Sequence, residues 1–295
     1  MKSLKHIFLI VFIIYSNNFF SSEEDKSFQE QSMLSVLFVQ TSAEFAANNI
    51  QTYANASKAL DIALNDKSWS AALEQIDDFQ DKQPAIIIDV DETVLDNSNF
   101  QSRTILSGLS YPNGWKEWVN EAKAGEVAGV RDFLYLAEEK GVAIYYLTNR
   151  LESLREGTIK NLINLGLPFD KNKNMLLMRK EENSRDKTER RKHIANKNRI
   201  LLVIGDQLTD FISTDEAYIY HKERKKLAEK YSEMWGTKWF LITNPTYGRW
   251  ELSIYEDFPE SEEEAIEIRK DTLCLLYTSD AADEGLGVDL GGRRI

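Results

Sequence analysis

Two aspartates, Asp89 and Asp91, stand directly after an apolar run in this sequence. Four consecutive apolar residues follow Pro84, which is typical of a buried strand in a parallel sheet. In open α/β folds, ligands bind at the loop just past the carboxyl end of such a strand. We therefore expect the D-x-D-x-T-x-L-D-N string that starts at Asp89 to carry chemistry. The alternative, a solvated aspartate-rich turn, does not explain the hydrophobic run before it.

Further polar groups follow the first motif in a fixed order. They are a strand-end threonine, Thr148, a lysine, Lys187, and a G-D-x-x-x-D string that contains Asp206 and Asp210. Each signal alone is weak, because Thr148 could be a helix N-cap, Lys187 a solvated lysine, and the two aspartates an N-cap and its helix face. Together with the first motif they form a four-part pattern.

This four-part pattern resembles the haloacid dehalogenase (HAD) superfamily of aspartate-nucleophile phosphatases. It is most similar to the bacterial class C acid phosphatases, which are secreted or outer-membrane enzymes with four essential aspartates. The similarity covers roughly Leu34 to Arg269 and includes the strings DVDETVLDNS, GWKEWV, YYLTNR, DKTERR, GDQLTDF and NPTYGRWE. The family's lipid-attachment cysteine is missing here, so the resemblance does not extend to membrane anchoring.

The resemblance implies a catalytic role for four of these residues. A phosphate monoester needs an in-line nucleophile, a proton for the leaving oxygen, and positive charge around the equatorial oxygens. Asp89 would attack and form an aspartyl phosphate. Asp91 would protonate the leaving group and then deprotonate the hydrolytic water, a role worth roughly 10²–10⁴-fold. Thr148 and Lys187 would bind the transferring phosphoryl oxygens, and Lys187 would also shield the nucleophile.

Four aspartates in one place are electrostatically costly. Two carboxylates about 5 Å apart repel by roughly 3 kcal/mol at an effective dielectric of about 20, so a divalent cation is required. Ligands that are all oxygens favour Mg²⁺ over Zn²⁺. By resemblance, the metal would take the Asp89 and Asp206 carboxylates and the Asp91 backbone carbonyl. Asp210 would hold a water ligand or lie just outside the ligand shell.

Aromatic residues point to the leaving group. By resemblance, Trp115 and Tyr247 match positions that sandwich a base or an aromatic leaving group, and stacking contributes roughly 1–3 kcal/mol per base. Core packing is the alternative for both, and it is the better interpretation of Trp118, one turn from Trp115. Asn149 and Arg150 are assigned to substrate binding.

Composition limits the class of ligand. The chain has 295 residues, a net charge of −12 and a pI near 4.9, and no basic cluster interleaved with aromatics, which argues against binding a nucleic acid duplex. A small phosphorylated metabolite remains compatible with an acidic body, because charges farther than about 8 Å are screened. The three histidines form no metal-ligand cluster, and neither a P-loop nor a G-x-G-x-x-G string occurs.

The elements that must hold these residues alternate between strands and helices. Strands are expected at 85–90, 142–147, 174–177, 199–204 and 238–242. Helices are expected at 29–65 (one or two), 70–79, 130–139, 151–165, 187–195 and 222–235. The alternation predicts one α/β domain with a doubly wound parallel sheet. The resemblance implies that this sheet is a Rossmannoid core of the HAD type. An N-terminal helical region and a small cap insert at about 97–129 complete it.

Both ends of the chain are predicted to lie outside the domain, which spans 28–271. A positive start and a short apolar stretch from Ile7 to Tyr15 predict a signal peptide at 1–22. The protein is therefore expected to be exported, either periplasmic or secreted, or membrane-associated through an uncleaved signal. Cys274 is the only cysteine, so no intramolecular disulfide can form. Residues 272–295 break the helical pattern and are interpreted as a non-native or disordered tail.

The leading hypothesis is a Mg²⁺-dependent phosphomonoesterase that acts on 5′-nucleotides, including nicotinamide mononucleotide, and on aryl phosphates. One alternative is a non-catalytic storage or small-ligand-binding protein on the same fold. Loss of the first aspartate would mark that class, and Asp89 is present. Another alternative is phosphotransfer to an alcohol acceptor. The sequence makes no prediction of the oligomeric state.

Overall fold

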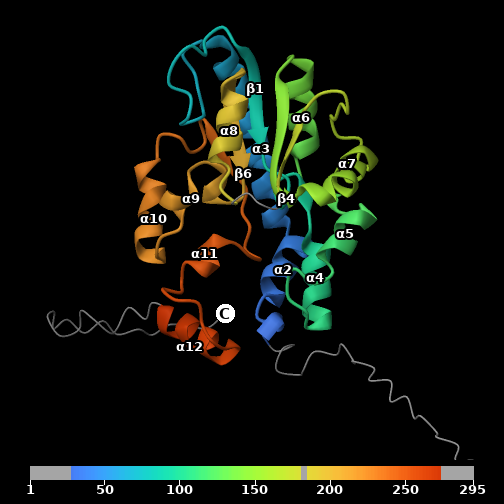
Figure 1. Ribbon diagram of the computed structural model, residues 1–295, viewed down its shortest axis with the longest axis vertical. Coiled ribbons are helices and arrows are strands. Elements are labelled where there is room, and N and C mark those ends of the chain that lie inside the picture. The colour runs from blue at the N-terminus through green and yellow to red at the C-terminus, as the bar shows by residue number, and fades with distance from the viewer. Residues whose placement is uncertain (1–27, 181–184, 274–295) are drawn as a thin grey trace, which may run out of the picture.

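A five-stranded parallel sheet forms the centre of the protein (Figure 1). The computed structural model describes residues 28–180 and 185–273, so the predicted signal peptide and the predicted tail beyond 273 lie outside the described residues. The sheet consists of β1 (Gln83–Ile88), β4 (Ala143–Leu151), β5 (Leu176–Arg179), β6 (Asn198–Gly205) and β7 (Trp239–Leu241). These are the five strands that the apolar runs predict.

The strand order places β1 in the middle of the sheet. The order is β5-β4-β1-β6-β7, and every neighbouring pair is parallel. The chain therefore moves outward from β1 to β5 and returns to the other side of β1 to form β6 and β7. Such a reversal opens a crevice at the carboxyl edge, where ligands bind in this kind of sheet.

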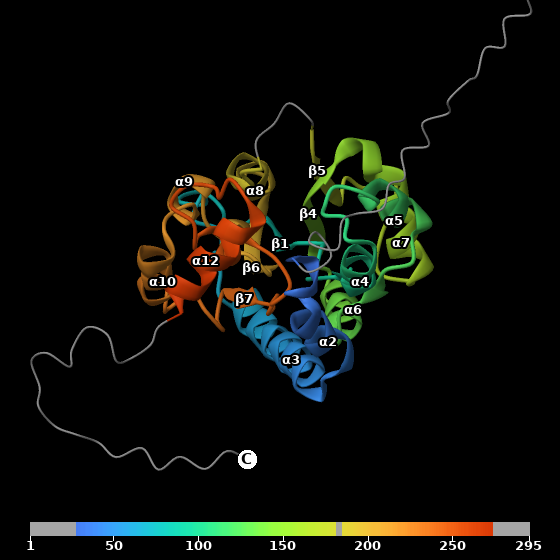
Figure 2. The same cartoon turned by 90° about the horizontal axis from the view of Figure 1, so that it is seen from below.

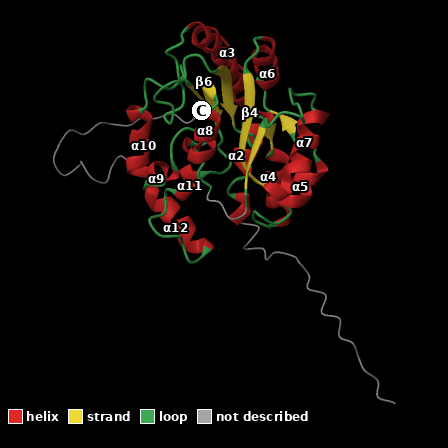
Figure 3. Ribbon diagram, turned by 45° about the horizontal axis from the view of Figure 1, so that its top comes forward, coloured by secondary structure: helices red, strands yellow, loops and turns green. Residues whose placement is uncertain are grey.

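Helices cover both faces of the sheet, as Figure 3 shows. The helices are α2 (Met33–Thr41), α3 (Ala43–Asn65), α4 (Ser98–Ser107), α5 (Trp115–Glu121), α6 (Val130–Glu139), α7 (Arg155–Asn164), α8 (Thr188–Ala195), α9 (Thr214–Ala217), α10 (His221–Lys230), α11 (Arg249–Leu252) and α12 (Glu262–Thr272), with short 3₁₀ turns at Glu152–Leu154 and Leu208–Asp210. Within the described ranges, no helix is both long enough and apolar enough to cross a bilayer.

The residues of β1 alternate between two hydrophobic cores. Ile86 and Ile88 pack with side chains of α3 and α6 on one face, whereas Ala85 and Ile87 pack with side chains of α8 and α10 on the other. A strand buried on both faces must be apolar throughout, which explains the unbroken run in the sequence. The predicted α/β class with a doubly wound parallel sheet is confirmed.

The segment 70–79, predicted as a helix, is not helical. Its polar groups form a few local hydrogen bonds, such as Ser70 Oγ to Gln75 Oε1 at 2.8 Å, and also bind the neighbouring strand β6. The Ala71 N–H donates to the Ile200 carbonyl at 2.8 Å. The Gln75 side chain donates to the Asn198 carbonyl at 2.7 Å and accepts from the Ile200 N–H at 3.0 Å. These tertiary hydrogen bonds outweigh the helical pattern of the segment.

Two predicted boundaries also shift. Strand β4 continues past Leu147 to Leu151, because Leu151 still pairs with Arg179 of β5. Helix α10 ends at Lys230 rather than at 235. The following residues form a turn in which the Met234 carbonyl accepts hydrogen bonds from residues 237–239, and this turn leads into β7.

A small insert lies between β1 and α6. It contains β2 (Leu95–Asp96), paired antiparallel with β3 (Gly125–Glu126), and helices α4 and α5. In Figures 1 and 2 these helices lie beside α2 and α7, below the carboxyl edge of the sheet. Asn161 of α7 fixes the insert, because its side chain donates to the Ala124 carbonyl at 2.8 Å and accepts from the Ala124 N–H at 3.1 Å.

Gly157 of α7 allows this close approach, and replacing it tests the contact. A Cβ at this position would lie 2.7 Å from the Val119 carbonyl oxygen of α5. We expect Gly157→Ala to lower the free energy of unfolding by about 1–3 kcal/mol, as overpacking does, in urea denaturation. Gly125→Ala is the matched control, since nothing lies within 4 Å of its Cβ position. Equal stability of the two variants would contradict the packing.

Candidate active site

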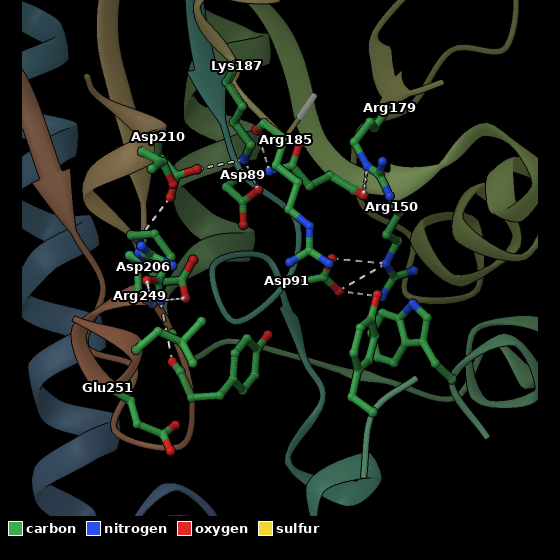
Figure 4. Close-up of a pocket in the computed structure, with 18 of the residues that line it drawn as sticks. Asp89, Asp91, Arg150, Arg179, Arg185, Lys187, Asp206, Asp210, Arg249 and Glu251 are labelled. Atoms are coloured by element: carbon green, nitrogen blue, oxygen red, sulfur yellow. Dashed lines mark hydrogen bonds and ion pairs between the residues drawn. The ribbon is translucent and has the colours of Figure 1, made fainter. Parts of the chain in front are cut away.

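Three carboxylates meet at the carboxyl edge of the sheet (Figure 4). Asp89 follows β1, and Asp206 and Asp210 follow β6; one oxygen of each lies within 4.8 Å of the others. They meet because β1 and β6 are parallel neighbours whose carboxyl ends coincide. Gly205 is required at the end of β6, since a Cβ there would overlap the Asp210 side chain. The structure thus brings together residues that are more than one hundred positions apart in the sequence.

Lys187 is the only described cation that forms ion pairs with this cluster. It precedes α8 and is buried, and its Nζ donates to Asp89 Oδ1 and, at 2.6 Å, to Asp210 Oδ1. Burial acts to lower the pKa of Lys187, but the Asp210 and Asp89 carboxylates outweigh it and raise the pKa above its usual value. Lys187 is therefore a charged part of the cluster and not a solvated lysine.

One ammonium group does not balance three carboxylates, of which Asp89 and Asp210 are buried and Asp206 is partly exposed. Burial raises the pKa of Asp89 well above its usual value, although Lys187 opposes the shift, and the Asp210, Asp206 and Asp91 carboxylates raise it further. Burial, then Asp210, raises the pKa of Asp206 to about 7, against hydrogen bonds from Asn244 and Gln207. The excess negative charge and the all-oxygen donor set fit a hard divalent cation such as Mg²⁺.

Asp91 lies in a different environment from the other three aspartates. Its carboxylate accepts hydrogen bonds from Arg150 Nη2 at 2.8 Å and Nε at 3.0 Å, and from Asn97 Nδ2 at 2.9 Å. Arg150 is itself buried and anchored to the Thr158 hydroxyl. Arg150, which the sequence analysis assigns to substrate binding, lines the cavity, and its guanidinium also holds the Asp91 carboxylate there.

Thr148 and Asn149 order the end of β4. Thr148 is fully buried within the strand, so it is not a helix N-cap. Its Oγ1 accepts from the Arg150 N–H at 3.0 Å and lies 3.4 Å from Asp91 Oδ2. Asn149 donates to the Arg185 carbonyl at 2.9 Å, which ties β4 to the chain just before Lys187.

The carboxylates open into a cavity of about 600 Å³ with aromatic walls. Trp115 and Tyr247 both line it, as the resemblance implies. Trp115 also packs on the hydrophobic core and on Phe100, with ring centroids 5.0 Å apart. Trp115 is therefore both a core residue and a lining residue of the cavity. Trp118 is buried, and its indole N–H donates to Asn97 Oδ1 at 2.8 Å, which agrees with a structural role.

Sequence reasoning missed Arg185 on the pocket wall, and Glu92 and Asn244, which do not line the pocket but support residues that do. Arg185 lines the pocket, and Figure 4 shows its side chain reaching toward Asp91. Glu92 is buried and accepts a hydrogen bond from the Tyr247 hydroxyl, so the aromatic wall is fixed to the catalytic loop. Asn244 donates to Asp206 at 2.8 Å. Glu92 could have been identified from the sequence, because it lies inside the D-x-D-x-T motif that starts at Asp89.

Comparisons with known proteins agree with this site. Residues 21–250 match the family of HAD superfamily, subfamily IIIB acid phosphatases. Two solved structures of the class C acid phosphatase from Bacillus anthracis, one with tungstate bound, are 34% identical and cover 84% of this chain and 98% of theirs, with TM-scores of 0.73 and 0.72. The fold and the cluster define a HAD phosphatase. The chain belongs to subfamily IIIB and is a class C acid phosphatase.

The carboxylate cluster makes the stability of the protein depend on pH. A carboxyl whose pKa is higher in the folded than in the unfolded state stabilises the fold at low pH, and this stability is lost as pH rises through the folded pKa. With a folded pKa of about 7 for Asp206, we expect the melting temperature of the metal-free protein to fall between about pH 5 and about pH 7. The increase in melting temperature on adding Mg²⁺ should become larger over the same pH range.

Thermal melts in chelator and in Mg²⁺ check this expectation. Groups whose pKa is lowered by folding, such as Asp186 with a pKa of about 2, change the stability mainly at pH values below this range. Asp206→Asn is the control, and it should flatten the fall. A wild-type melting temperature that rises with pH in chelator, or an unchanged slope in the variant, would contradict it.

Proposed function

We propose that the enzyme hydrolyses phosphomonoesters through an aspartyl-phosphate intermediate with the help of Mg²⁺. The observation that carries the proposal is the Asp89 carboxylate at the floor of the cavity, held by Lys187 and flanked by Asp206 and Asp210. A cluster of carboxylates with one lysine at the end of a pocket suits a phosphate group that binds together with a divalent cation. A storage or ligand-binding protein would not require this nucleophile.

The chain's own groups can perform both halves of the reaction. Asp89 attacks phosphorus in line with the leaving oxygen, whose bond to phosphorus breaks as the new bond to the carboxylate forms. Asp91 donates a proton to the leaving oxygen. It then takes a proton from the water that hydrolyses the aspartyl phosphate, which restores Asp89. Arg150 keeps the Asp91 carboxylate in one orientation for both transfers.

Cationic and polar groups surround the expected position of the phosphoryl oxygens. Lys187 can release Asp89 and bind an oxygen of the transferred group, and Arg185 supplies a guanidinium from the pocket wall. Thr148 is buried behind the cavity wall, with its hydroxyl 3.4 Å from Asp91 Oδ2. Asp89 and Asp206 would hold the cation, with Asp210 beside them. When bound, Mg²⁺ would neutralise these carboxylates and stabilise negative charge on the phosphoryl group. The tungstate in the Bacillus anthracis structure supports an oxyanion site, because tungstate is tetrahedral like phosphate.

Replacing the nucleophile tests the intermediate. We expect Asp89→Asn to lower kcat by at least ~10⁴-fold, because an amide cannot form the acyl phosphate, and a chelator to abolish wild-type activity. Release of inorganic phosphate from nucleoside monophosphates at mildly acid pH measures both. Asp132→Asn, an exposed aspartate on α6, is the matched control. Substantial turnover by Asp89→Asn, or chelator-insensitive wild-type activity, would count against the mechanism.

We further propose that the substrates are 5′-nucleotides, including nicotinamide mononucleotide, and aryl phosphates. The support is the pair of aromatic residues on the cavity wall, Trp115 and Tyr247, within a volume that accepts a nucleotide. The short apolar stretch near the N-terminus supports export to the periplasm or the medium as part of the same proposal.

Two variants of Tyr247 separate stacking from hydrogen bonding. We expect Tyr247→Ala to raise KM for nucleoside monophosphates roughly 10-fold, since stacking contributes about 1–3 kcal/mol, and to affect small sugar phosphates much less. Tyr247→Phe keeps the ring and loses only the bond to Glu92, so its KM should stay close to the wild-type value. Wild-type kinetics that favour sugar phosphates over mononucleotides would contradict the aromatic clamp.

A further inference from the structure

Arg191 of α8 is a charged side chain with almost no exposure to solvent. Its exposed fraction is 1%, and it forms an ion pair with Glu74, whose Oε1 lies 2.8 Å from Arg191 Nε and 2.7 Å from Nη2. A buried charge needs such a partner, because an unpaired ion is costly to remove from water. Glu74 belongs to the segment 70–79, which binds β6 and is not helical. The path of that segment therefore supplies the negative charge that Arg191 needs.

The other side of the Arg191 guanidinium holds the loop that carries two of the clustered carboxylates. Its Nη1 donates to the Thr209 carbonyl at 3.1 Å and to the Asp210 carbonyl at 3.2 Å. Both carbonyls belong to the 3₁₀ turn Leu208–Asp210, which begins two residues after Asp206. The backbone of this turn determines where the Asp210 side chain starts. Arg191 therefore fixes the Asp210 carboxylate through the backbone of its residue.

The start of α8 holds Asp210 at two points. Lys187, which directly precedes the helix, donates to the Asp210 carboxylate at 2.6 Å, whereas Arg191 donates to the backbone carbonyl of the same residue. Lys187 and Arg191 are four positions apart, so their side chains share one face of the helix. A residue that is bound at both its carboxylate and its carbonyl has little freedom to turn away from Asp89 and Asp206.

We propose that Arg191 is a positioning residue that sets the affinity of the carboxylate cluster for its divalent cation. The inference rests on the proposed function, because it concerns the Mg²⁺ that Asp89 and Asp206 would hold. Mg²⁺ demands nearly ideal octahedral ligand positions, so a shift of the loop would weaken its binding. Residues that orient metal ligands from outside typically contribute about 10–100-fold to metal affinity. Arginine suits this task, since its planar fork binds Glu74 and two carbonyls at once, whereas lysine has a single nitrogen.

Calorimetry of Mg²⁺ binding to the chelator-stripped protein, without substrate, tests the proposal. Arg191→Lys keeps the charge that pairs with Glu74 but loses the fork, so we expect its dissociation constant for Mg²⁺ to rise about 10–100-fold. Arg199→Lys is the matched control. Arg199 has an exposed fraction of 3% and also donates to backbone carbonyls, including that of Ala63 at 3.0 Å, but it lies at the end of β6 opposite Asp206. This control should melt earlier in chelator, as Arg191→Lys should, and keep the wild-type affinity for Mg²⁺.

Kinetics supply a second readout. In Arg191→Lys, the Mg²⁺ concentration that gives half-maximal phosphate release should rise in step with the dissociation constant, and kcat at saturating Mg²⁺ should stay close to the wild-type value. An unchanged Mg²⁺ affinity in Arg191→Lys would overturn the proposal. Equal losses of affinity in Arg191→Lys and Arg199→Lys would overturn it too, because they would show a general effect on the fold.

Glu74→Gln provides the test if Arg191→Lys does not fold. This variant keeps the shape of the side chain but removes the charge that orients Arg191, and a neutral acceptor binds a guanidinium more weakly. Its Mg²⁺ affinity should fall several-fold, and an unchanged affinity would overturn the proposal. A wild type that binds no Mg²⁺ would reject the proposed cation and this inference with it. A wild type that binds Mg²⁺ but hydrolyses no phosphomonoester would reject the proposed reaction and leave the calorimetric result for Arg191 decisive.

Discussion

The close approach of three carboxylates, two of them buried, beside a single ammonium group is the constraint on which this site depends. At an effective dielectric of about 20, each pair about 5 Å apart repels by roughly 3 kcal/mol, and Lys187 compensates only part of this. The remaining charge is tolerated because β1 and β6 are anchored by apolar side chains on both faces of the sheet. The cluster is thus held by the core. Its uncompensated negative charge favours a divalent cation, and a bound cation together with Lys187 would in turn favour a phosphate group.

The sequence predicted the sheet and the convergence of the aspartates for a simple physical reason. Unbroken apolar runs identify strands buried on both faces, and parallel strands bring their carboxyl ends to one edge. Contacts that depend on the folded structure were not predictable. The segment 70–79 has a helical pattern but binds β6, and the hydrogen bond of Arg150 in β4 to Asp91 joins residues 59 positions apart. Nothing local in the sequence distinguishes these outcomes.

The cap insert connects substrate recognition to the acid and base. Trp115 lies in the cavity wall, and its ring also faces the Arg150 guanidinium at 5.3 Å. Arg150 in turn holds Asp91, and Asn97 joins Asp91 to Trp118 through the two ends of its amide. Trp115, the proposed contact of the leaving group, is therefore two contacts away from Asp91, the proposed acid and base. This arrangement explains why one tryptophan of the insert belongs to both the core and the pocket.

The charge of the whole chain and the charge around the cavity differ in this enzyme, because basic side chains match the carboxylates that line the cavity. The chain carries a charge of −12, yet Lys187, Arg185 and Arg249 line the cavity that receives an anion. Because screening in physiological salt limits the reach of charge to about 8 Å, the acidic exterior contributes little at the cavity floor, and the nearby cations decide binding there. Catalytic groups at the sheet edge fix the reaction, whereas the arginines on the surrounding loops and short helices can differ without disturbing it. Selectivity among phosphomonoesters therefore resides in the walls of the cavity.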